Sequence, residues 1–181
     1  MLSSEEAKRL LDTAELICSA DIVSDAIRCM AADITVALSD RYPLVLSVMG
    51  GAVVFTGQLL PLLRFPLDFD YIHVSRYHNK ISGGQIDWKV VPRENIQGRV
   101  VLVLDDILDE GVTLAAIRER VVGNGAAAFY SAVLADKDIG RSKPISADFV
   151  GVTLPNRYVF GFGMDVHGAW RNLPEIYAMK D

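Results

Sequence analysis

The chain has 181 residues, about half of them hydrophobic, and a formal net charge of −5. This length suits a single domain with a core of its own. The acidic balance argues against broad nucleic-acid binding, which needs a basic face, and no uninterrupted apolar run is long enough to span a bilayer.

The N-terminal sequence and the cysteines indicate a cytoplasmic protein. The first residues, MLSSEEAKRLL, lack the basic-then-apolar order of a secretory signal. Cys18 and Cys29 are the only cysteines of the chain, and we expect both to be free buried thiols in a reducing compartment. We therefore expect neither a membrane nor a nucleic acid as a partner.

Residues 1–40 predict two helices that serve packing. Ser3 and Glu6 have capping-box spacing, and one apolar face follows them, so we expect a helix over residues 4–18. Asp21 is a candidate cap for a second helix with apolar residues at helical spacing, which should end near Asp40.

A strand, a glycine turn and a helix are expected next. Residues 44–49, LVLSVM, predict a buried strand, and a helix is expected over residues 52–63. Gly50 and Gly51 lie between them, in a geometry that lets the backbone approach an anion closely. Taken alone, such a turn is most simply a plain connection.

The middle of the chain predicts a hairpin with a long loop. Residues 69–75, FDYIHVS, alternate apolar and polar side chains as a strand does, and residues 86–92 are a candidate antiparallel partner. The loop between them, RYHNKISGGQ, is polar and glycine-rich. It is either a solvated loop or a lid, because loops of this length in compact domains often close over a site. We interpret His73 and His78 as surface or hairpin residues, since no histidines or cysteines have metal-ligand spacing.

The most informative stretch is 100–114, VVLVLDDILDEGVTL. An apolar strand leads into Asp105, Asp106 and Asp109, and a tight turn with the Thr113 hydroxyl opens a helix. Ligands of α/β sheets bind beyond the carboxyl ends of strands, where N–H groups suit a phosphate monoester and carboxylates suit sugar hydroxyls, Mg²⁺ or both. Helix capping needs one acidic residue rather than three, so the pattern favours a binding site.

The last third of the chain completes an α/β pattern. We expect a helix over residues 114–122 and strands over residues 126–135 and 149–154, followed after a turn by the aromatic run YVFGF at residues 158–162. Together with the earlier strands, they predict a mostly parallel central sheet flanked by helices.

The stretch DDILDEGVT resembles the phosphoribosyl-pyrophosphate signature of the type I phosphoribosyltransferases, which is acidic-acidic-apolar-apolar-Asp-x-Gly-x-Thr after an apolar strand. The resemblance covers nearly everything from residue 44 to residue 179. It implies the type I phosphoribosyltransferase fold, with a small hood and a flexible hairpin lid, as one domain over residues 1–181. Its expected parts are the N-terminal helices, the hairpin with its lid and the C-terminal hood, at residues 1–40, 69–92 and 155–181.

The resemblance implies how phosphoribosyl pyrophosphate binds. Asp105 and Asp106 would engage the ribose hydroxyls and Mg²⁺, and Asp109 would be the base near the purine. The residues expected to bind phosphoribosyl pyrophosphate are Met49, Gly50, Gly51, Tyr77 of the lid, Asp105, Asp106, Ile107, Leu108, Asp109, Glu110, Gly111, Val112, Thr113 and Arg171.

Two residues depart from the family pattern. Met49 stands where the hypoxanthine-guanine phosphoribosyltransferases have a lysine, so its backbone can serve but the charge is lost. Glu110 stands where members often have threonine, and its carboxylate must point away from a phosphate. The resemblance also implies a non-proline cis peptide in this glycine loop, at the bond between Val48 and Met49.

The purine is expected to meet the residues after the later strands. Lys137 would donate to the purine O6, and because a lysine has donors only, it suits a 6-oxo group and mismatches the 6-amino group of adenine. Tyr158 would stack on the ring, and the Val159 backbone would read the edge of the base. Asp165 would bind a second Mg²⁺ near the purine.

These roles imply transfer of the 5-phosphoribosyl group from phosphoribosyl pyrophosphate to N9 of hypoxanthine or guanine, which gives IMP or GMP in purine salvage. The family forms homodimers and homotetramers. A xanthine-preferring transferase and a nucleotide-binding regulator on the same fold stay open as alternatives. An aspartyl phosphatase would need Asp-x-Asp at the strand end, which DDILD does not provide.

Overall fold

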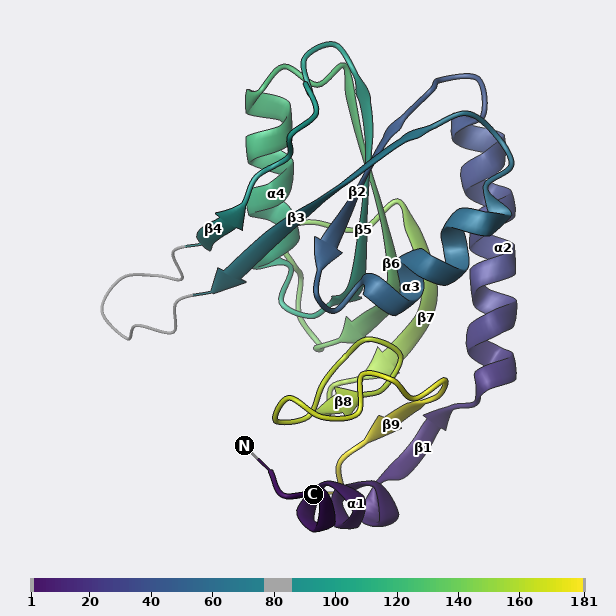
Figure 1. Ribbon diagram of the computed structural model, residues 1–181, viewed down its shortest axis with the longest axis vertical. Coiled ribbons are helices and arrows are strands. Elements are labelled where there is room, and N and C mark those ends of the chain that lie inside the picture. Colours follow the sequence, from purple (N-terminus) through teal and green to yellow (C-terminus); the bar gives the residue numbers. More distant parts are fainter. Residues whose placement is uncertain (1, 77–85, 181) are drawn as a thin grey trace.

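A six-stranded sheet runs through the middle of the protein in the order β4-β3-β2-β5-β6-β7 (Figure 1). The structure, a computed structural model, describes residues 2–76 and 86–180. All neighbouring strands are parallel except β4, which pairs antiparallel with β3 at one edge. The strands are β2 (Leu44–Met49), β3 (Asp68–Arg76), β4 (Ile86–Val90), β5 (Val100–Leu108), β6 (Ala128–Asp138) and β7 (Phe149–Pro155).

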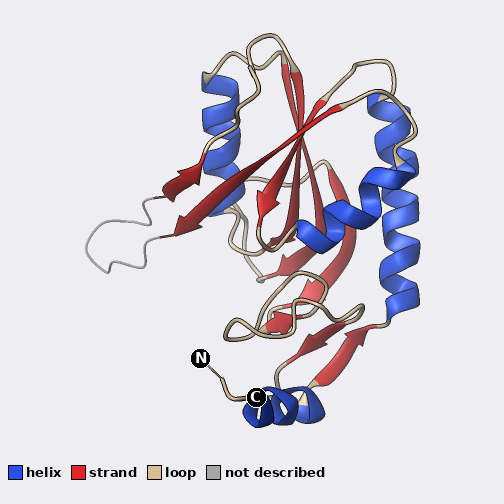
Figure 2. Ribbon diagram, viewed as in Figure 1, coloured by secondary structure: helices blue, strands red, loops and turns tan. Residues whose placement is uncertain are grey.

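Helices cover both faces of this sheet (Figure 2). One face packs against α2 (Ala20–Leu38) and α3 (Val53–Leu59), and the other packs against α4 (Val112–Gly123). In β5, Leu102 and Leu104 belong to the first of these buried clusters, and Val101 and Val103 belong to the second. A strand that is buried on both faces reads as a continuous apolar run, which is why this strand was visible in the sequence. The predicted mostly parallel sheet flanked by helices is confirmed.

A small antiparallel sheet lies beyond the carboxyl ends of the large one, at the lower end of Figure 1. Its order is β1-β9-β8, so it joins the beginning of the chain to its end. Its strands, together with the first helix, are α1 (Ser4–Thr13), β1 (Glu15–Cys18), β8 (Val159–Phe160) and β9 (Ile176–Ala178). This sheet carries the loop of residues 161–171, which reaches the functional site.

The helix predicted over residues 4–18 is wrong in its second half. The capping box of Ser3 and Glu6 is present, with Ser3 N donating to Glu6 Oε2 at 2.7 Å. However, α1 ends at Thr13, and the following residues form β1, which pairs with β9. The pairing partner lies at the other end of the chain, so local periodicity could not indicate it.

Other element boundaries also differ from the predictions. Ser19 caps α2 in place of Asp21, since the Ser19 hydroxyl accepts from the Ile22 N–H. The helix expected to reach residue 63 ends at Leu59 and continues as a short 3₁₀ turn, η1 (Leu60–Leu62), because Pro61 has no N–H for a further helical bond.

The strands around the site extend further along the chain than predicted. β5 includes Asp105 and Asp106, and β6 includes Lys137, which was expected just beyond a strand end.

Cys18 is buried as predicted, but Cys29 is exposed, and both are free thiols in the structure. No helix in the described part of the chain is long and apolar enough to cross a membrane.

Candidate active site

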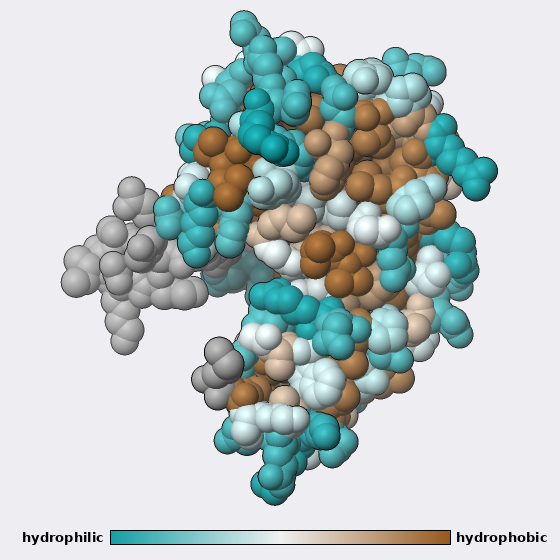
Figure 3. All heavy atoms as spheres, viewed as in Figure 1, coloured by the Kyte–Doolittle hydropathy of each residue, from teal (hydrophilic) through white to brown (hydrophobic). Residues whose placement is uncertain are grey.

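A cavity of about 600 Å³ lies at the carboxyl ends of β2 and β5. Figure 3 shows the surface hollowed here, between the body above and the lower lobe that carries the small sheet. The lining joins the end of β2, the end of β5, the start of α4 and the loop 161–171. The predicted site residues that line it are Met49, Gly50, Gly51, Asp105, Asp106, Ile107, Leu108, Asp109, Gly111, Thr113, Asp165 and Arg171.

Gly51 is the point where three segments of the site meet. A Cβ built on Gly51 would lie 1.8 Å from Oδ2 of Asp106, so any larger residue at this position would displace that carboxylate. A Cβ built on Gly163, whose φ is +99°, would lie 2.0 Å from the Gly51 carbonyl oxygen. The close packing of these two glycines therefore brings the end of β2, the end of β5 and the loop 161–171 together.

One detail of the glycine loop differs from the predictions. The cis peptide bond joins Met49 to Gly50, one position later than predicted. His73 lies in the β3–β4 hairpin, as interpreted, and it also lines the cavity. The parallel register of β2 and β3 pairs Met49 with His73, and this register was the signal that would have placed the histidine.

Asp105 and Asp106 bring two carboxylates into a largely buried position at the end of β5. Burial and the neighbouring charge of Asp106 raise the pKa of Asp105 well above its ordinary value. Burial also raises the pKa of Asp106, although hydrogen bonds and the Arg171 guanidinium partly offset that rise. Two buried like charges favour a cation or hydroxyl donors beside them, so this pair suits Mg²⁺ or a sugar.

Asp109 and Lys137 form an ion pair at the edge of the cavity. Lys137 Nζ donates to Asp109 Oδ2 at 2.8 Å, and the lysine is buried while the carboxylate is half exposed. The pairing of Leu108 with Asp136 in the sheet places the next residue of each strand side by side. An ammonium group has three donors, so Lys137 can bind Asp109 and an acceptor on a ligand together.

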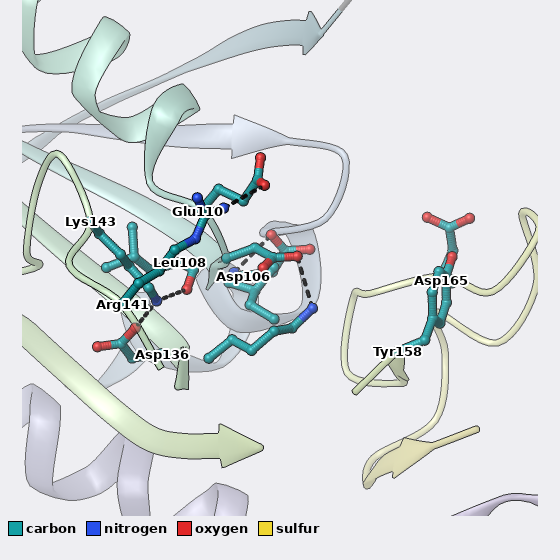
Figure 4. Close-up of polar contacts among 11 residues, drawn as sticks. Asp106, Leu108, Glu110, Asp136, Arg141, Lys143, Tyr158 and Asp165 are labelled. Carbon is teal, nitrogen blue, oxygen red and sulfur yellow. Dashed lines mark hydrogen bonds and ion pairs between the residues drawn. The ribbon is translucent and has the colours of Figure 1, made fainter. Parts of the chain in front are cut away.

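The turn after Asp109 leads into α4. Gly111 is the N-cap of this helix and has φ +81°, a conformation that favours glycine. The first N–H groups of a helix are donors without intrahelical partners and suit an anion. Arg141 Nη2 lies 3.2 Å from Glu110 Oε1, and Glu110 is not part of the cavity lining. The glutamate side chain is thus directed to Arg141, as a phosphate-binding turn requires (Figure 4).

The loop 161–171 supplies the opposite wall. Arg171 binds Asp165 Oδ1 at 2.6 Å and donates to the Gly163 carbonyl at 2.6 Å. The Tyr158 hydroxyl donates to the Asp165 carbonyl at 3.2 Å, and Tyr158 as a residue is 53% exposed. Figure 4 shows Tyr158 and Asp165 standing across the site from Asp106. Val159, by contrast, is buried at the start of β8.

Comparisons with known proteins give the family of the chain. Residues 19–167 match the family described as phosphoribosyl transferase domain. The chain belongs to this family. It is 34% identical over 177 residues to the hypoxanthine-guanine-xanthine phosphoribosyltransferase of Tritrichomonas foetus, with 97% of each chain covered.

Further relatives agree in sequence and in structure. The chain is 31% identical over 170 residues to the hypoxanthine-guanine phosphoribosyltransferase of Bacillus subtilis, which covers 93% of this chain and 94% of the relative. A crystal structure of a hypoxanthine phosphoribosyltransferase from Staphylococcus aureus superposes with a TM-score of 0.89, at 25% identity, with 95% of each chain covered. The predicted type I phosphoribosyltransferase fold is therefore confirmed.

Asp105 and Asp106 offer carboxylate oxygens, the ligand type that Mg²⁺ prefers. Within residues 2–76 and 86–180, no group of three or more histidine, cysteine, aspartate or glutamate side chains is placed to hold a metal. Mg²⁺ is commonly bound by one or two carboxylates together with substrate phosphates. Asp105 and Asp106 meet that requirement. Tyr77, the predicted lid residue, lies outside the described residues.

Asp105→Asn should make the metal-free protein more stable. The variant keeps the oxygen that accepts from the Asp106 N–H but removes a buried charge, so we expect a gain on the order of 1 kcal/mol in the free energy of unfolding at neutral pH. A folded-state pKa above the unfolded one means that wild-type stability falls as pH rises beyond about 4. Hence the gain should grow with pH.

The measurement is denaturant unfolding of wild type and Asp105→Asn in the presence of a chelator, at a series of pH values. A gain that shrinks toward neutral pH, or a loss of stability there, would contradict the desolvated carboxylate pair.

Proposed function

We propose that this phosphoribosyltransferase transfers the 5-phosphoribosyl group from phosphoribosyl pyrophosphate to N9 of hypoxanthine or guanine, giving IMP or GMP and pyrophosphate. The observation that carries the proposal is the pair of Lys137 and Asp109 beside the carboxylate-lined cavity. The names of the relatives support a transferase of purine salvage. Its proposed location is the cytoplasm, where free thiols stay reduced.

Phosphoribosyl pyrophosphate would extend along the floor of the cavity. The N–H groups of residues 110–113 bind its 5′-phosphate, and Asp105 and Asp106 hold Mg²⁺ and the ribose hydroxyls. When bound, Mg²⁺ neutralises charge on the pyrophosphate leaving group. The backbone of Gly50 and Gly51 would contact the pyrophosphate and, like Arg171, lies in the wall beside Asp106. A fork of guanidinium donors suits this anion.

The purine would bind where Asp109 and Lys137 meet. Lys137 donates to the purine O6, which excludes the 6-amino group of adenine. Asp109 accepts the N7 proton as charge builds on the base during transfer. The exposed ring of Tyr158 stacks on the purine, while the Val159 backbone reads its edge and Asp165 holds a second Mg²⁺.

The protein is proposed to assemble as a homodimer or homotetramer. Phe69 and Tyr71 on β3 and Val53 and Leu62 around α3 are apolar side chains left at least 37% exposed. Phe69 pairs with Val45, which packs on the α3 side of the sheet, and Figure 3 shows hydrophobic surface over this part of the molecule. A surface of this kind suits burial against a second copy of the chain.

The proposed function is tested by product formation from phosphoribosyl pyrophosphate and Mg²⁺ with hypoxanthine, guanine, xanthine or adenine. We expect turnover of hypoxanthine and guanine and none of adenine, because Lys137 offers donors only. Turnover of xanthine in preference to both would establish the xanthine alternative. Absence of turnover with every base, while phosphoribosyl pyrophosphate still binds, would contradict an enzymatic role and favour a regulator.

Asp109→Asn should lower kcat far more than it raises KM. The amide keeps an oxygen that accepts from Lys137 but cannot take a proton, so we expect kcat to fall about 100-fold or more. Asp138→Asn is the matched control, since Asp138 is a nearby exposed carboxylate that accepts from the Gly140 N–H. Steady-state kinetics of both variants make the comparison, and an unchanged kcat in Asp109→Asn would remove Asp109 from the mechanism.

A further inference from the structure

The segment that joins β6 to β7, residues 139–148, packs against the ends of β5 and β6, next to the active site. We call it the strap. Together with Arg118 of α4 and residues of β6 and β7, it lines a second cavity of about 800 Å³, and Leu108 lines both this cavity and the one described above. The charged groups of the strap could serve a separate ligand there or the active site itself, and their contacts decide between these two roles.

Lys143 of the strap contacts the ends of two central strands. Its Nζ donates to the Leu108 carbonyl at 2.7 Å and to Asp136 Oδ1 at 2.5 Å, and its side chain is only 11% exposed. Leu108 and Asp136 are partners in the register of β5 and β6. The ammonium group therefore bridges the last residue of β5 to its neighbour on β6 (Figure 4).

The residues that follow these two contacts are the pair that would handle the purine. Asp109 comes directly after Leu108, and Lys137 comes directly after Asp136, and the two side chains lie 2.8 Å apart. The bridge adds a side-chain contact to the backbone pairing of the two strands, at the position where this pair begins. A misplacement of about 1 Å can cost about 100-fold in rate, so such a constraint matters to catalysis.

The strap also contacts the turn that follows Asp109. A Cβ built on Gly111 would lie 3.2 Å from Pro144 Cδ and 3.3 Å from Lys143 Cβ, so the strap is in contact with the turn itself. Arg141 binds Glu110 from the same segment. The strap thus touches the residue before Asp109 and both residues after it.

We propose that Lys143 is a positioning residue, which holds Asp109 and Lys137 in reacting geometry by bridging the ends of β5 and β6. The inference rests on the proposed function, because it assigns Lys143 a role in the same transfer reaction. A buried ammonium group costs free energy unless it is well paired, and an apolar side chain could fill the same space. We attribute its presence here to its two directed contacts.

A double-mutant cycle tests whether Lys143 acts through Asp109. Lys143→Met removes the donors, and we expect kcat to fall about tenfold or more with smaller changes in KM. Lys143→Arg keeps charge and donors and should recover most of the loss. In the Asp109→Asn background, Lys143→Met should cause little further loss of kcat, because both changes affect one proton transfer. Independent losses that multiply would overturn the proposal.

Amide hydrogen exchange provides a readout that does not depend on turnover. We expect exchange across residues 108–113 to become about tenfold faster in Lys143→Met, since the Leu108 carbonyl loses the Lys143 donor that ties this segment to the strap. Lys8→Met, at an exposed lysine of α1, is the matched control and should leave that segment unchanged.

The two readouts separate the proposals. If wild type turns over no base, the proposed function fails, and exchange still decides whether the bridge orders residues 108–113. Lower thermal stability of Lys143→Met with unchanged kcat and unchanged local exchange would show a role in stability alone and overturn the positioning role.

Discussion

The contact between the Gly51 backbone and the Asp106 carboxylate is the constraint on which the rest of the site depends. The end of β2 lies so close to the end of β5 that a Cβ on Gly51 would be 1.8 Å from Asp106 Oδ2. From its other side, Gly163 rests against the Gly51 carbonyl, and Arg171 is held to Gly163 by its side chain and by its own carbonyl. One close contact thus sets where the carboxylates, the glycine turn and the guanidinium stand relative to one another.

The same arrangement places two carboxylates in a largely buried position, where ionised groups are destabilising. Asp105 and Asp106 are largely buried at the end of an apolar strand, with the pKa of each raised by desolvation. The Arg171 guanidinium reduces this cost at Asp106 only in part. A magnesium ion and a polyhydroxylated, phosphorylated substrate would supply the missing positive charge and donors. The two buried carboxylates at the end of β5 therefore lower the stability of the free protein and increase its affinity for a charged ligand.

Sequence reasoning could predict the parts of the site that are local in the chain. The apolar run before Asp105 identifies a strand buried on both faces, and the acidic-glycine-threonine spacing identifies the turn and the helix after it. Contacts between distant segments could not be predicted. β1 depends on a partner at the far end of the chain, His73 reaches the cavity through strand register, and Lys143 meets Leu108 only once the strap has folded back. The cis peptide bond lies one position later than predicted, because the sequence shows where the glycines are but not which peptide bond is cis.

The most direct test of the central claim is the calorimetric affinity of Gly51→Ala for phosphoribosyl pyrophosphate in the presence of Mg²⁺. Gly57→Ala is the matched control, because a Cβ at Gly57 meets no described atom within 4 Å and alanine suits the interior of α3. Circular dichroism of both variants establishes that they are folded. We expect Gly51→Ala to bind at least about tenfold more weakly than wild type, and Gly57→Ala to bind normally. Wild-type affinity in folded Gly51→Ala would contradict the account, because the site would then tolerate displacement of the contact on which it is built.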